Sequence, residues 1–243
     1  MNASQNEPEN AQAEALRLAS RIQSTIISNT LTRDRWEQHI AECLKFHFQA
    51  AMIPPAWVKR TAEALRGTGV KVASFIDFPY GTMTSPGKSY EAGQLVGQGA
   101  EEIDLMPNVG FLLSGMEREY ADDIAGVVKA AGKIPVKIML ELPLLSARQK
   151  ERAIALSVDA GVSYLKNASG GAVGVATADE IIFLRRLAPP QVRVKASGGI
   201  KTAQQVRDLV KAGADLVGTS AGTQIMAELL GGAAAIPSDI APY

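Results

Sequence analysis

Short apolar runs alternate with longer amphipathic stretches along almost the whole chain. Most of these runs are continuous, as in Val70-Lys71-Val72-Ala73-Ser74-Phe75-Ile76, and do not alternate strictly between apolar and polar residues. That pattern is typical of strands covered on both faces, and it therefore favours a parallel sheet. The segments that predict strands are a weak candidate at 28–32, followed by 49–53, 70–77, 102–107, 134–141, 162–167, 192–196 and 215–219.

The stretches between these runs carry the start and stop signals of helices. Thr32 precedes one helical pattern, and Thr202 with Gln205 forms a capping box ahead of another. Several of the helical patterns end close to a glycine, such as Gly132 or Gly161. Residues 11–27 predict a further amphipathic helix ahead of the first strand.

Eight strands that alternate with helices predict an α/β fold, the (β/α)8 or TIM barrel, with an extra N-terminal helix. An open doubly wound sheet is the rival, but it usually has fewer strands and a glycine-rich first turn, which this chain lacks. We expect one barrel domain over residues 11–232. Residues 1–10 are expected to be disordered, and residues 233–243 to form a flexible C-terminal tail.

Composition narrows the class of protein. The 243 residues carry 25 basic and 25 acidic side chains, without a basic run or an acidic tail, so neither nucleic acid nor a membrane surface is an expected partner. No apolar run approaches the length of a membrane span, and the polar N-terminus does not resemble a signal peptide. Cys43 is the one cysteine and excludes an internal disulfide. We therefore expect a cytoplasmic protein.

Two lysines each stand near the end of a short apolar run, just before a turn. Lys166 follows Val162-Ser163-Tyr164-Leu165, and Lys195 follows Val192-Arg193-Val194. A lysine at the edge of a buried strand is costly unless its ammonium is paired or functional. Two placed alike predict a site in which one positive charge lowers the pKa of the other, and a neutral lysine amine is the nucleophile of Schiff-base chemistry.

Other residues are expected at the same end of the barrel, where barrel enzymes carry their chemistry. Asp104 lies among apolar neighbours in the fourth strand, and two ammonium groups nearby would keep it ionised. Ser197-Gly198-Gly199 and the segment 218–222 each open a helix after the last two strands, where barrels commonly bind phosphate. Glu141 ends the fifth strand, and the sequence does not distinguish a site residue from a structural ion pair there. No spacing typical of metal ligands occurs.

At these residues the chain resembles the deoxyribose-phosphate aldolases, which are class I aldolases on a (β/α)8 barrel. The resemblance covers nearly the whole chain after residue 30. Its most specific stretches are Phe75-Ile76-Asp77-Phe78-Pro79-Tyr80-Gly81, Gly99-Ala100-Glu101-Glu102-Ile103-Asp104, the segment 110–115, Ala160-Gly161-Val162-Ser163-Tyr164-Leu165-Lys166, Val194-Lys195-Ala196-Ser197-Gly198-Gly199-Ile200 and the segment 213–222.

The resemblance implies reversible cleavage of 2-deoxy-D-ribose 5-phosphate to acetaldehyde and D-glyceraldehyde 3-phosphate, without a metal or other cofactor. It implies that Lys166 forms the Schiff base, that Lys195 is the charge that depresses its pKa, and that Asp104 relays protons. Tyr243 is a further catalytic candidate, because the family's tail often ends in a tyrosine that folds into the site. The implied phosphate-binding residues are Ser169, Gly170, Gly198, Gly199, Gly218 and Ser220.

Departures from the family pattern lie around the substrate and not around the lysines. The family usually has Lys-Thr-Ser-Thr-Gly where this chain has Lys166-Asn167-Ala168-Ser169-Gly170, and a lysine found next in some members is Gly171 here. The family's acid after the first strand is replaced near Ser28-Asn29, and its Cys and Asn near the second strand become Met52 and Pro54.

These departures leave two alternatives open. One is an aldolase of the same mechanism that acts on another aldehyde pair, phosphorylated or unphosphorylated. The other is a non-catalytic paralogue that binds a sugar phosphate. The partners expected in either case are small molecules, together with a second copy of the chain in a homodimer.

Overall fold

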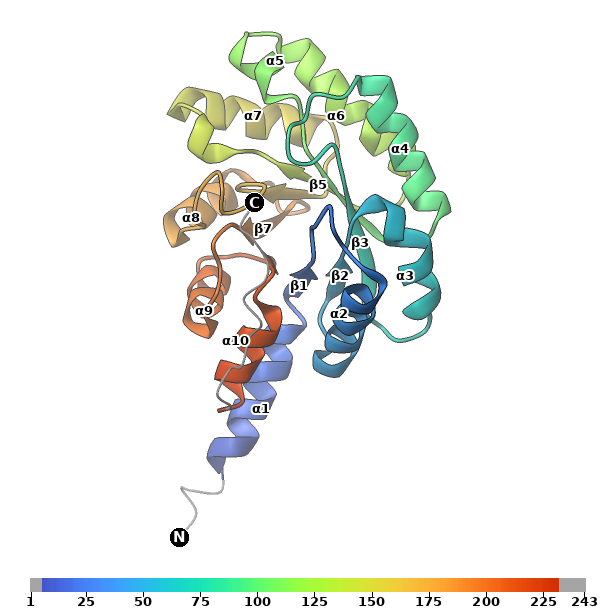
Figure 1. The fold of residues 1–243 in the computed structure, drawn as a ribbon. Coiled ribbons are helices and arrows are strands. Elements are labelled where there is room, and N and C mark those ends of the chain that lie inside the picture. Colours follow the sequence, from blue (N-terminus) through green and yellow to red (C-terminus); the bar gives the residue numbers. More distant parts are fainter. Residues whose placement is uncertain (1–5, 232–243) are drawn as a thin grey trace.

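Eight short parallel strands pair in chain order and close into a barrel, because β1 pairs with β8 as well as with β2. The computed structural model describes residues 6–231, and Figure 1 shows the helices that surround the strands. The strands are β1 Ile22–Thr25, β2 Ala50–Met52, β3 Lys71–Ile76, β4 Glu102–Leu105, β5 Val136–Met139, β6 Tyr164–Lys166, β7 Arg193–Ser197 and β8 Leu216–Thr219. The predicted (β/α)8 barrel is confirmed.

The helices pack their apolar faces on the outside of the strands. Thr32 caps α2 and Thr202 forms the capping box of α9, as the sequence predicts. The helices are α1 Asn6–Ala19, α2 Arg33–Phe46, α3 Val58–Ala64, α4 Ser85–Gly97, α5 Val109–Leu113, α6 Glu117–Ala131, α7 Ala147–Asp159, α8 Ala178–Leu187, α9 Ala203–Lys211 and α10 Gly222–Leu229, with short 3-10 turns at Pro55–Trp57 and Leu142–Leu144.

Helix α1 is the extra N-terminal helix, and it lies alongside α10 (Figure 1). It begins at Asn6, inside the segment 1–10 for which the sequence predicts disorder. Pro8 falls in the first turn, where the backbone N–H groups have no helical partner and a proline is tolerated. Glu14 ties the helix to the barrel by accepting two hydrogen bonds of 2.9 Å from Arg207 of α9.

The first strand lies earlier in the chain than the sequence predicts. It is Ile22–Thr25, inside the segment 11–27 for which the pattern predicts a helix, and residues 28–32 instead form the loop that leads to the N-cap of α2. Only Ser20 and Arg21 separate α1 from β1, so the apolar pattern of the helix runs into that of the strand. The other seven predicted strands lie within about two residues of those observed, which is the usual uncertainty of strand ends.

The interior of the barrel has two unlike halves. Strands β2 and β3 supply an apolar wall made of Ala50, Met52, Ala73 and Phe75, against which Ile27 and Phe78 pack. The opposite strands, β4 to β7, point lysines and carboxylates inward. This division places charge next to a surface that excludes water.

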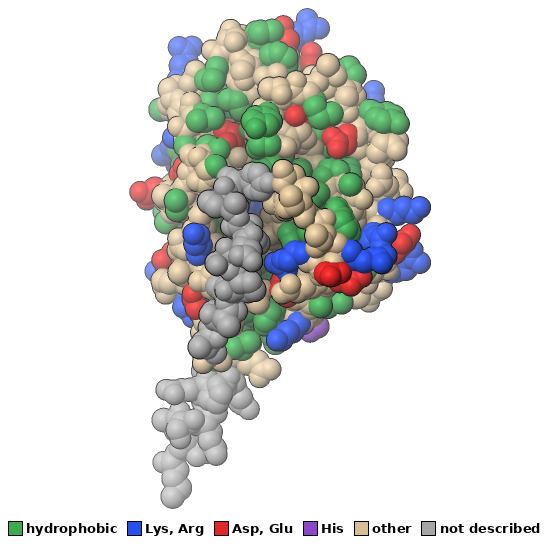
Figure 2. Space-filling view, in the orientation of Figure 1, with side chains coloured by type: hydrophobic (Ala, Val, Ile, Leu, Met, Phe, Trp, Pro, Cys, Tyr) green, Lys and Arg blue, Asp and Glu red, His purple; other side chains and the backbone are tan. Residues whose placement is uncertain are grey.

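The face of the molecule drawn in Figure 2 shows no comparable segregation of charge. Basic and acidic side chains are mixed around the edge of the face in Figure 2, in keeping with the equal numbers of the two in the sequence. Within residues 6–231, none of the helices combines the length and the apolar composition needed to cross a lipid bilayer.

Candidate active site

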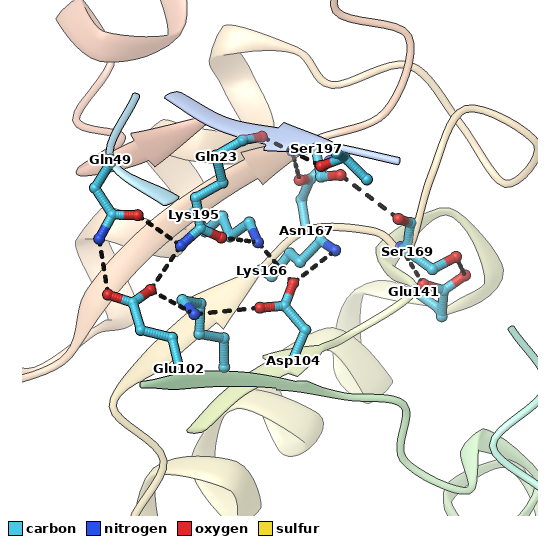
Figure 3. Close-up of polar contacts among 12 residues, drawn as sticks. Gln23, Gln49, Glu102, Asp104, Glu141, Lys166, Asn167, Ser169, Lys195 and Ser197 are labelled. Carbon is cyan, nitrogen blue, oxygen red and sulfur yellow. Dashed lines mark hydrogen bonds and ion pairs between the residues drawn. The ribbon is translucent and has the colours of Figure 1, made fainter. Parts of the chain in front are cut away.

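Lys166 and Lys195 lie opposite each other on neighbouring strands. Lys166 is the last residue of β6, Lys195 is the third residue of β7, and the two are register partners. Both ammonium groups donate to Asp104 Oδ2, at 3.0 Å from Lys166 and 2.7 Å from Lys195. Asp104 reaches them from β4 across the barrel interior (Figure 3). The structure therefore brings together the three residues that the sequence selects.

A third lysine and a second carboxylate belong to the same cluster, and neither is among the residues that the sequence selects. Lys137 of β5 places its Nζ 2.7 Å from Glu102 Oε2 and 3.3 Å from Asp104 Oδ1. Lys137, Glu102 and Asp104 are each no more than 1% exposed. A signal for Lys137 exists, because it interrupts the apolar run of the fifth strand just as Lys166 closes that of the sixth.

The carboxylates of this cluster are ionised. Burial alone would raise the pKa of Asp104, but the ammonium groups of Lys195, Lys166 and Lys137 hold it well below its usual range. In the same way, burial opposes ionisation of Glu102, while Lys137 and further hydrogen-bond donors lower its pKa to about 2. Both groups therefore carry a negative charge at neutral pH.

Protonation of all three lysines of the cluster is less favourable than ionisation of its carboxylates. Burial, together with the positive charges of Lys166 and Lys137, lowers the pKa of Lys195 to about 7 against the attraction of Asp104. Lys195 and Lys166 share one carboxylate oxygen, so this titration belongs to the pair. Near neutral pH the pair can accordingly hold one neutral amine beside one ammonium.

Access distinguishes the two lysines. Lys166 is 6% exposed, whereas Lys195 is 1% exposed and lies deeper in the barrel. On the other side of the interior, the Phe75 and Phe78 rings lie 5.3 Å apart and form part of the apolar wall. A small aldehyde that enters the barrel can thus reach Lys166 first.

Glycine-rich turns after β6 and β7 approach each other closely. Gly198 has a φ of +113°, and a Cβ there would lie 2.4 Å from the carbonyl oxygen of Gly174 and 3.4 Å from that of Gly170. Gly199 has a φ of +63° and lies against the side chain of Val175. A Cβ on Gly171 would lie 3.2 Å from the backbone nitrogen of Gly199. Only glycine fits at Gly198, so Gly170, Gly198 and Gly199 form one continuous backbone surface.

Three of the predicted phosphate-binding residues have other surroundings. The backbone N–H and the hydroxyl of Ser169 both donate to Glu141, a buried residue whose pKa is raised by burial. Gly218 lies in β8 beside Lys195, and a Cβ there would come within 3.0 Å of Lys195 Cε. Ser220 is exposed after β8, just before α10. Tyr243 lies outside the described residues.

Gln23 is a further member of the cluster that the sequence does not reveal, because its strand falls inside a predicted helix. Its side chain, completely buried on β1, accepts a hydrogen bond from Lys195 and donates one of 2.6 Å to Glu102. Ser28-Asn29, where the sequence predicts the replaced acid, lies in the following loop, and Gln23 is the residue that β1 directs at the cluster. Among residues 6–231, no group of three or more His, Cys, Asp and Glu side chains is arranged to hold a metal ion.

Fold and site together define a class of protein: a (β/α)8 barrel that carries two buried lysines around one carboxylate, the arrangement that Schiff-base chemistry requires. The chain matches no protein-family model. It is 38% identical to the deoxyribose-phosphate aldolase of Brevibacillus brevis over 84% of this chain and 93% of the relative. With that of Bacillus cereus strain ATCC 10987 it shares 39% identity over 87% and 95%.

Solved structures agree with these relatives. A deoxyribose phosphate aldolase from Aeropyrum pernix, described as a unique tetramer, superposes with a TM-score of 0.80 at 28% identity, over 92% of this chain and 97% of the other. The chain belongs to the deoxyribose-phosphate aldolase family.

Proposed function

We propose that this protein is a class I aldolase that reversibly cleaves 2-deoxy-D-ribose 5-phosphate to acetaldehyde and D-glyceraldehyde 3-phosphate. The observation that carries the proposal is the contact of two lysines with one ionised carboxylate oxygen, at 3.0 Å and 2.7 Å, in a cluster buried from water. Family membership supports the same reaction, because the relatives are named for this activity.

The reaction begins at Lys166. Its neutral amine attacks C1 of the open-chain aldehyde and gives a carbinolamine, which loses water to form an iminium ion. Lys195 keeps its proton, and this neighbouring charge favours the neutral form of Lys166. The apolar wall of β2 and β3 limits the water that competes at the reacting carbon.

Carbon–carbon cleavage follows from the iminium ion. Asp104 takes the proton of the C3 hydroxyl through a water molecule, the C3 oxygen forms a carbonyl, and the C2–C3 bond breaks. The electron pair of that bond passes through C1 to the iminium nitrogen and gives an enamine, while glyceraldehyde 3-phosphate leaves. Protonation of the enamine at C2 and hydrolysis release acetaldehyde and restore Lys166.

The substrate phosphate fits best on the backbone surface of Gly170, Gly198 and Gly199. Backbone N–H groups of glycine-rich turns bind phosphate without a basic side chain. Ser220 would contribute its hydroxyl from the start of α10, and Tyr243 would assist protonation of the enamine from the tail. Gly218 lies close to Lys195, and its lack of a side chain leaves the space that the lysine side chain occupies.

A second function, the same chemistry on an unphosphorylated aldehyde, has one observation in its favour. The turn after β6 presents Gly171 instead of a basic side chain, and the neighbouring Ser169 gives both its donors to Glu141. Comparing kcat/KM for deoxyribose with and without its 5-phosphate separates the two. A preference for the phosphate well above about tenfold excludes the second function, since a built phosphate site discriminates strongly.

Borohydride trapping with acetaldehyde tests the proposed chemistry. The expected result is one added ethyl group per chain, mapped by mass spectrometry to Lys166, together with cleavage of deoxyribose 5-phosphate. Lys166→Ala should abolish both, whereas Lys133→Ala, which removes an exposed lysine before β5, should change neither. A folded wild-type protein that gives no adduct would contradict the proposal, and a non-catalytic sugar-phosphate-binding role would replace it.

Assembly and location belong to the same proposal. We propose a homodimer as the smallest assembly and a cytoplasmic site of action. A phosphorylated sugar is an intracellular substrate, and the single cysteine, Cys43, is free and buried. Sedimentation in solution tests the homodimer. It would distinguish a dimer from a tetramer, the assembly described for the Aeropyrum pernix relative.

A further inference from the structure

Gln23 is a buried, uncharged side chain within the charged cluster. Its Oε1 accepts a hydrogen bond from Lys195 Nζ. Its Nε2 donates to Glu102 Oε2 at 2.6 Å and to Gln49 Oε1 at 2.7 Å. The side chain is fully buried, and Figure 3 shows it between Lys195 on one side and Glu102 with Gln49 on the other.

Neighbouring charges fix the orientation of this amide. An ammonium group only donates and an ionised carboxylate only accepts. Because Glu102 is ionised, the amide nitrogen of Gln23 must face Glu102, and its oxygen must therefore face Lys195. The amide is thus a preset acceptor aimed at one lysine of the pair.

Lys195 and Lys166 differ in their acceptors at this point. In the part of the chain that the structure describes, Lys166 Nζ donates to Asp104 Oδ2, whereas Lys195 Nζ donates both to Asp104 Oδ2 and to Gln23 Oε1. Asp104 contacts both lysines with the same oxygen, and of the two lysines Lys195 is the one that also donates to Gln23. A hydrogen bond to an ammonium stabilises the protonated form.

We infer that Gln23 is a positioning residue that decides which of the two lysines keeps the proton: its amide oxygen holds the proton on Lys195, so that Lys166 is the neutral amine. The inference rests on the proposed function only for the use that the reaction makes of that amine. Gln23 acts through Lys195 and need not touch the substrate.

The charged groups of the other strands do not account for a preference for the proton on Lys195 over Lys166. Around the pair lie titratable or charged side chains from four strands, namely Lys71 of β3, Glu102 and Asp104 of β4, Lys137 of β5 and Tyr164 of β6. Lys137 repels Lys195 and so opposes a proton there, and Lys71 lies half-exposed at the far end of the cluster next to Glu102. Tyr164 stays neutral, because burial raises its pKa.

Glu141, which follows β5, acts in the opposite sense. Its carboxyl interacts with Lys166, and burial raises the pKa of that carboxyl. Where Glu141 is ionised, its charge favours a proton on Lys166 and not on Lys195. The asymmetry that Gln23 supplies must therefore outweigh Glu141.

The test measures protonation of each lysine separately from activity. Wild-type protein is labelled over pH 5 to 11 with isotopic formaldehyde and cyanoborohydride, and mass mapping gives the labelling midpoint of Lys166 and of Lys195. In the wild type, Lys166 should have the lower midpoint. Gln23→Met, which keeps the length of the side chain but removes the acceptor, should reduce the separation of the midpoints by about one to two pH units.

A matched control is Gln49→Met. The side chain of Gln49 hydrogen-bonds to Gln23 and Glu102 and, among the described residues, to no lysine, so the separation of the midpoints should stay within about 0.3 units of the wild type. If Gln23→Met does not fold, Gln23→Asn serves in its place, because a side chain one methylene shorter keeps the amide and withdraws its oxygen from Lys195. It should reduce the separation in the same direction.

The outcomes separate this inference from the proposed function. An unchanged separation in a folded Gln23 variant overturns the inference, even if the enzyme cleaves deoxyribose 5-phosphate. A higher midpoint for Lys166 than for Lys195 in the wild type overturns it as well. A reduced separation in a protein that shows no cleavage supports the inference and rejects the proposed function.

Discussion

Lys195 shows how a buried lysine depends on the charges around it. In the cluster, three buried lysines, Lys137, Lys166 and Lys195, face two buried carboxylates, Glu102 and Asp104. With both carboxylates ionised, a full set of ammonium groups would leave one buried positive charge without a partner, which is costly. The loss of one proton near neutral pH removes that excess and leaves a nucleophilic amine.

Replacing Lys195 by methionine should therefore raise the pH at which the enzyme becomes active. In Lys195→Met, two lysines face two carboxylates, the charges balance, and Lys166 no longer has a reason to lose its proton. Activity requires the neutral amine, so the acidic limb of the pH–kcat profile, expected near pH 7 in the wild type, should move upward by about two units or more.

The control for this prediction is Lys71→Met, which removes a half-exposed lysine next to Glu102 and away from Asp104. Its profile should change by less than about half a unit, since solvent screens that charge. An acidic limb that stays near pH 7 in Lys195→Met would show that Lys195 does not set the protonation of Lys166.

At the scale of the elements, the turn after β7 determines the shape of the proposed phosphate surface. Gly198 combines a left-handed backbone with a close approach to the carbonyl oxygen of Gly174. A side chain at this position would push apart the turns that follow β6 and β7. These turns are held by the hydrogen bond of 2.9 Å from Ala176 N–H to the Gly198 carbonyl.

Gly198→Ala should weaken phosphate binding more than it affects chemistry. We expect KM for deoxyribose 5-phosphate to rise about tenfold or more, and the free energy of unfolding to fall by about 3 kcal/mol. Gly67→Ala is the control, because Gly67 has a φ of +76° but no atom within 4 Å of the point that a Cβ would occupy. It should cost only about 1 kcal/mol and leave KM unchanged. Equal effects of the two substitutions would contradict a role for the close approach.

The elements also show what sequence reasoning can reach. The parallel barrel follows from apolar runs such as the one around Val72, and Lys166 and Lys195 stand out because a charge at the end of such a run needs a reason. Gln23 could not be found in the same way, because β1 is four residues long, largely polar, and separated from α1 by two residues. The contact of Ser169 with Glu141 depends on how two loops meet, which no local pattern records.

At the scale of the whole molecule, the buried cluster lowers the free energy of unfolding and, in return, provides a reactive amine. Burial and the neighbouring ammonium groups lower the pKa at Lys195 to about 7, against 10.5 for an ordinary lysine, and the proton that is lost belongs to the Lys166–Lys195 pair, which shares one carboxylate oxygen. Between these values the unfolded chain binds a proton that the folded chain lacks, so raising the pH favours the folded state. Burial of this lysine pair is therefore most destabilising below pH 7 and ceases to be so above about pH 10.5.

Denaturation by urea at several pH values measures this effect. The free energy of unfolding of the wild type, relative to that of Lys195→Met, should rise with pH between about 7 and 10 by roughly 1 kcal/mol per unit. Using the difference cancels the titration of the surface lysines, which both proteins share. A difference that stays flat, or falls, over this range would contradict the loss of a proton from the lysine pair near pH 7.

The two unlike halves of the barrel interior also differ in how freely their side chains can be substituted. Met52 and Phe75 belong to the apolar wall, whereas a Cβ at Gly218 would come within 3.0 Å of Lys195 Cε. Substitutions on β2 and β3, in nature or in the laboratory, can accordingly change which aldehyde acceptor binds, while the residues of β4 to β8 that support the amine chemistry stay the same.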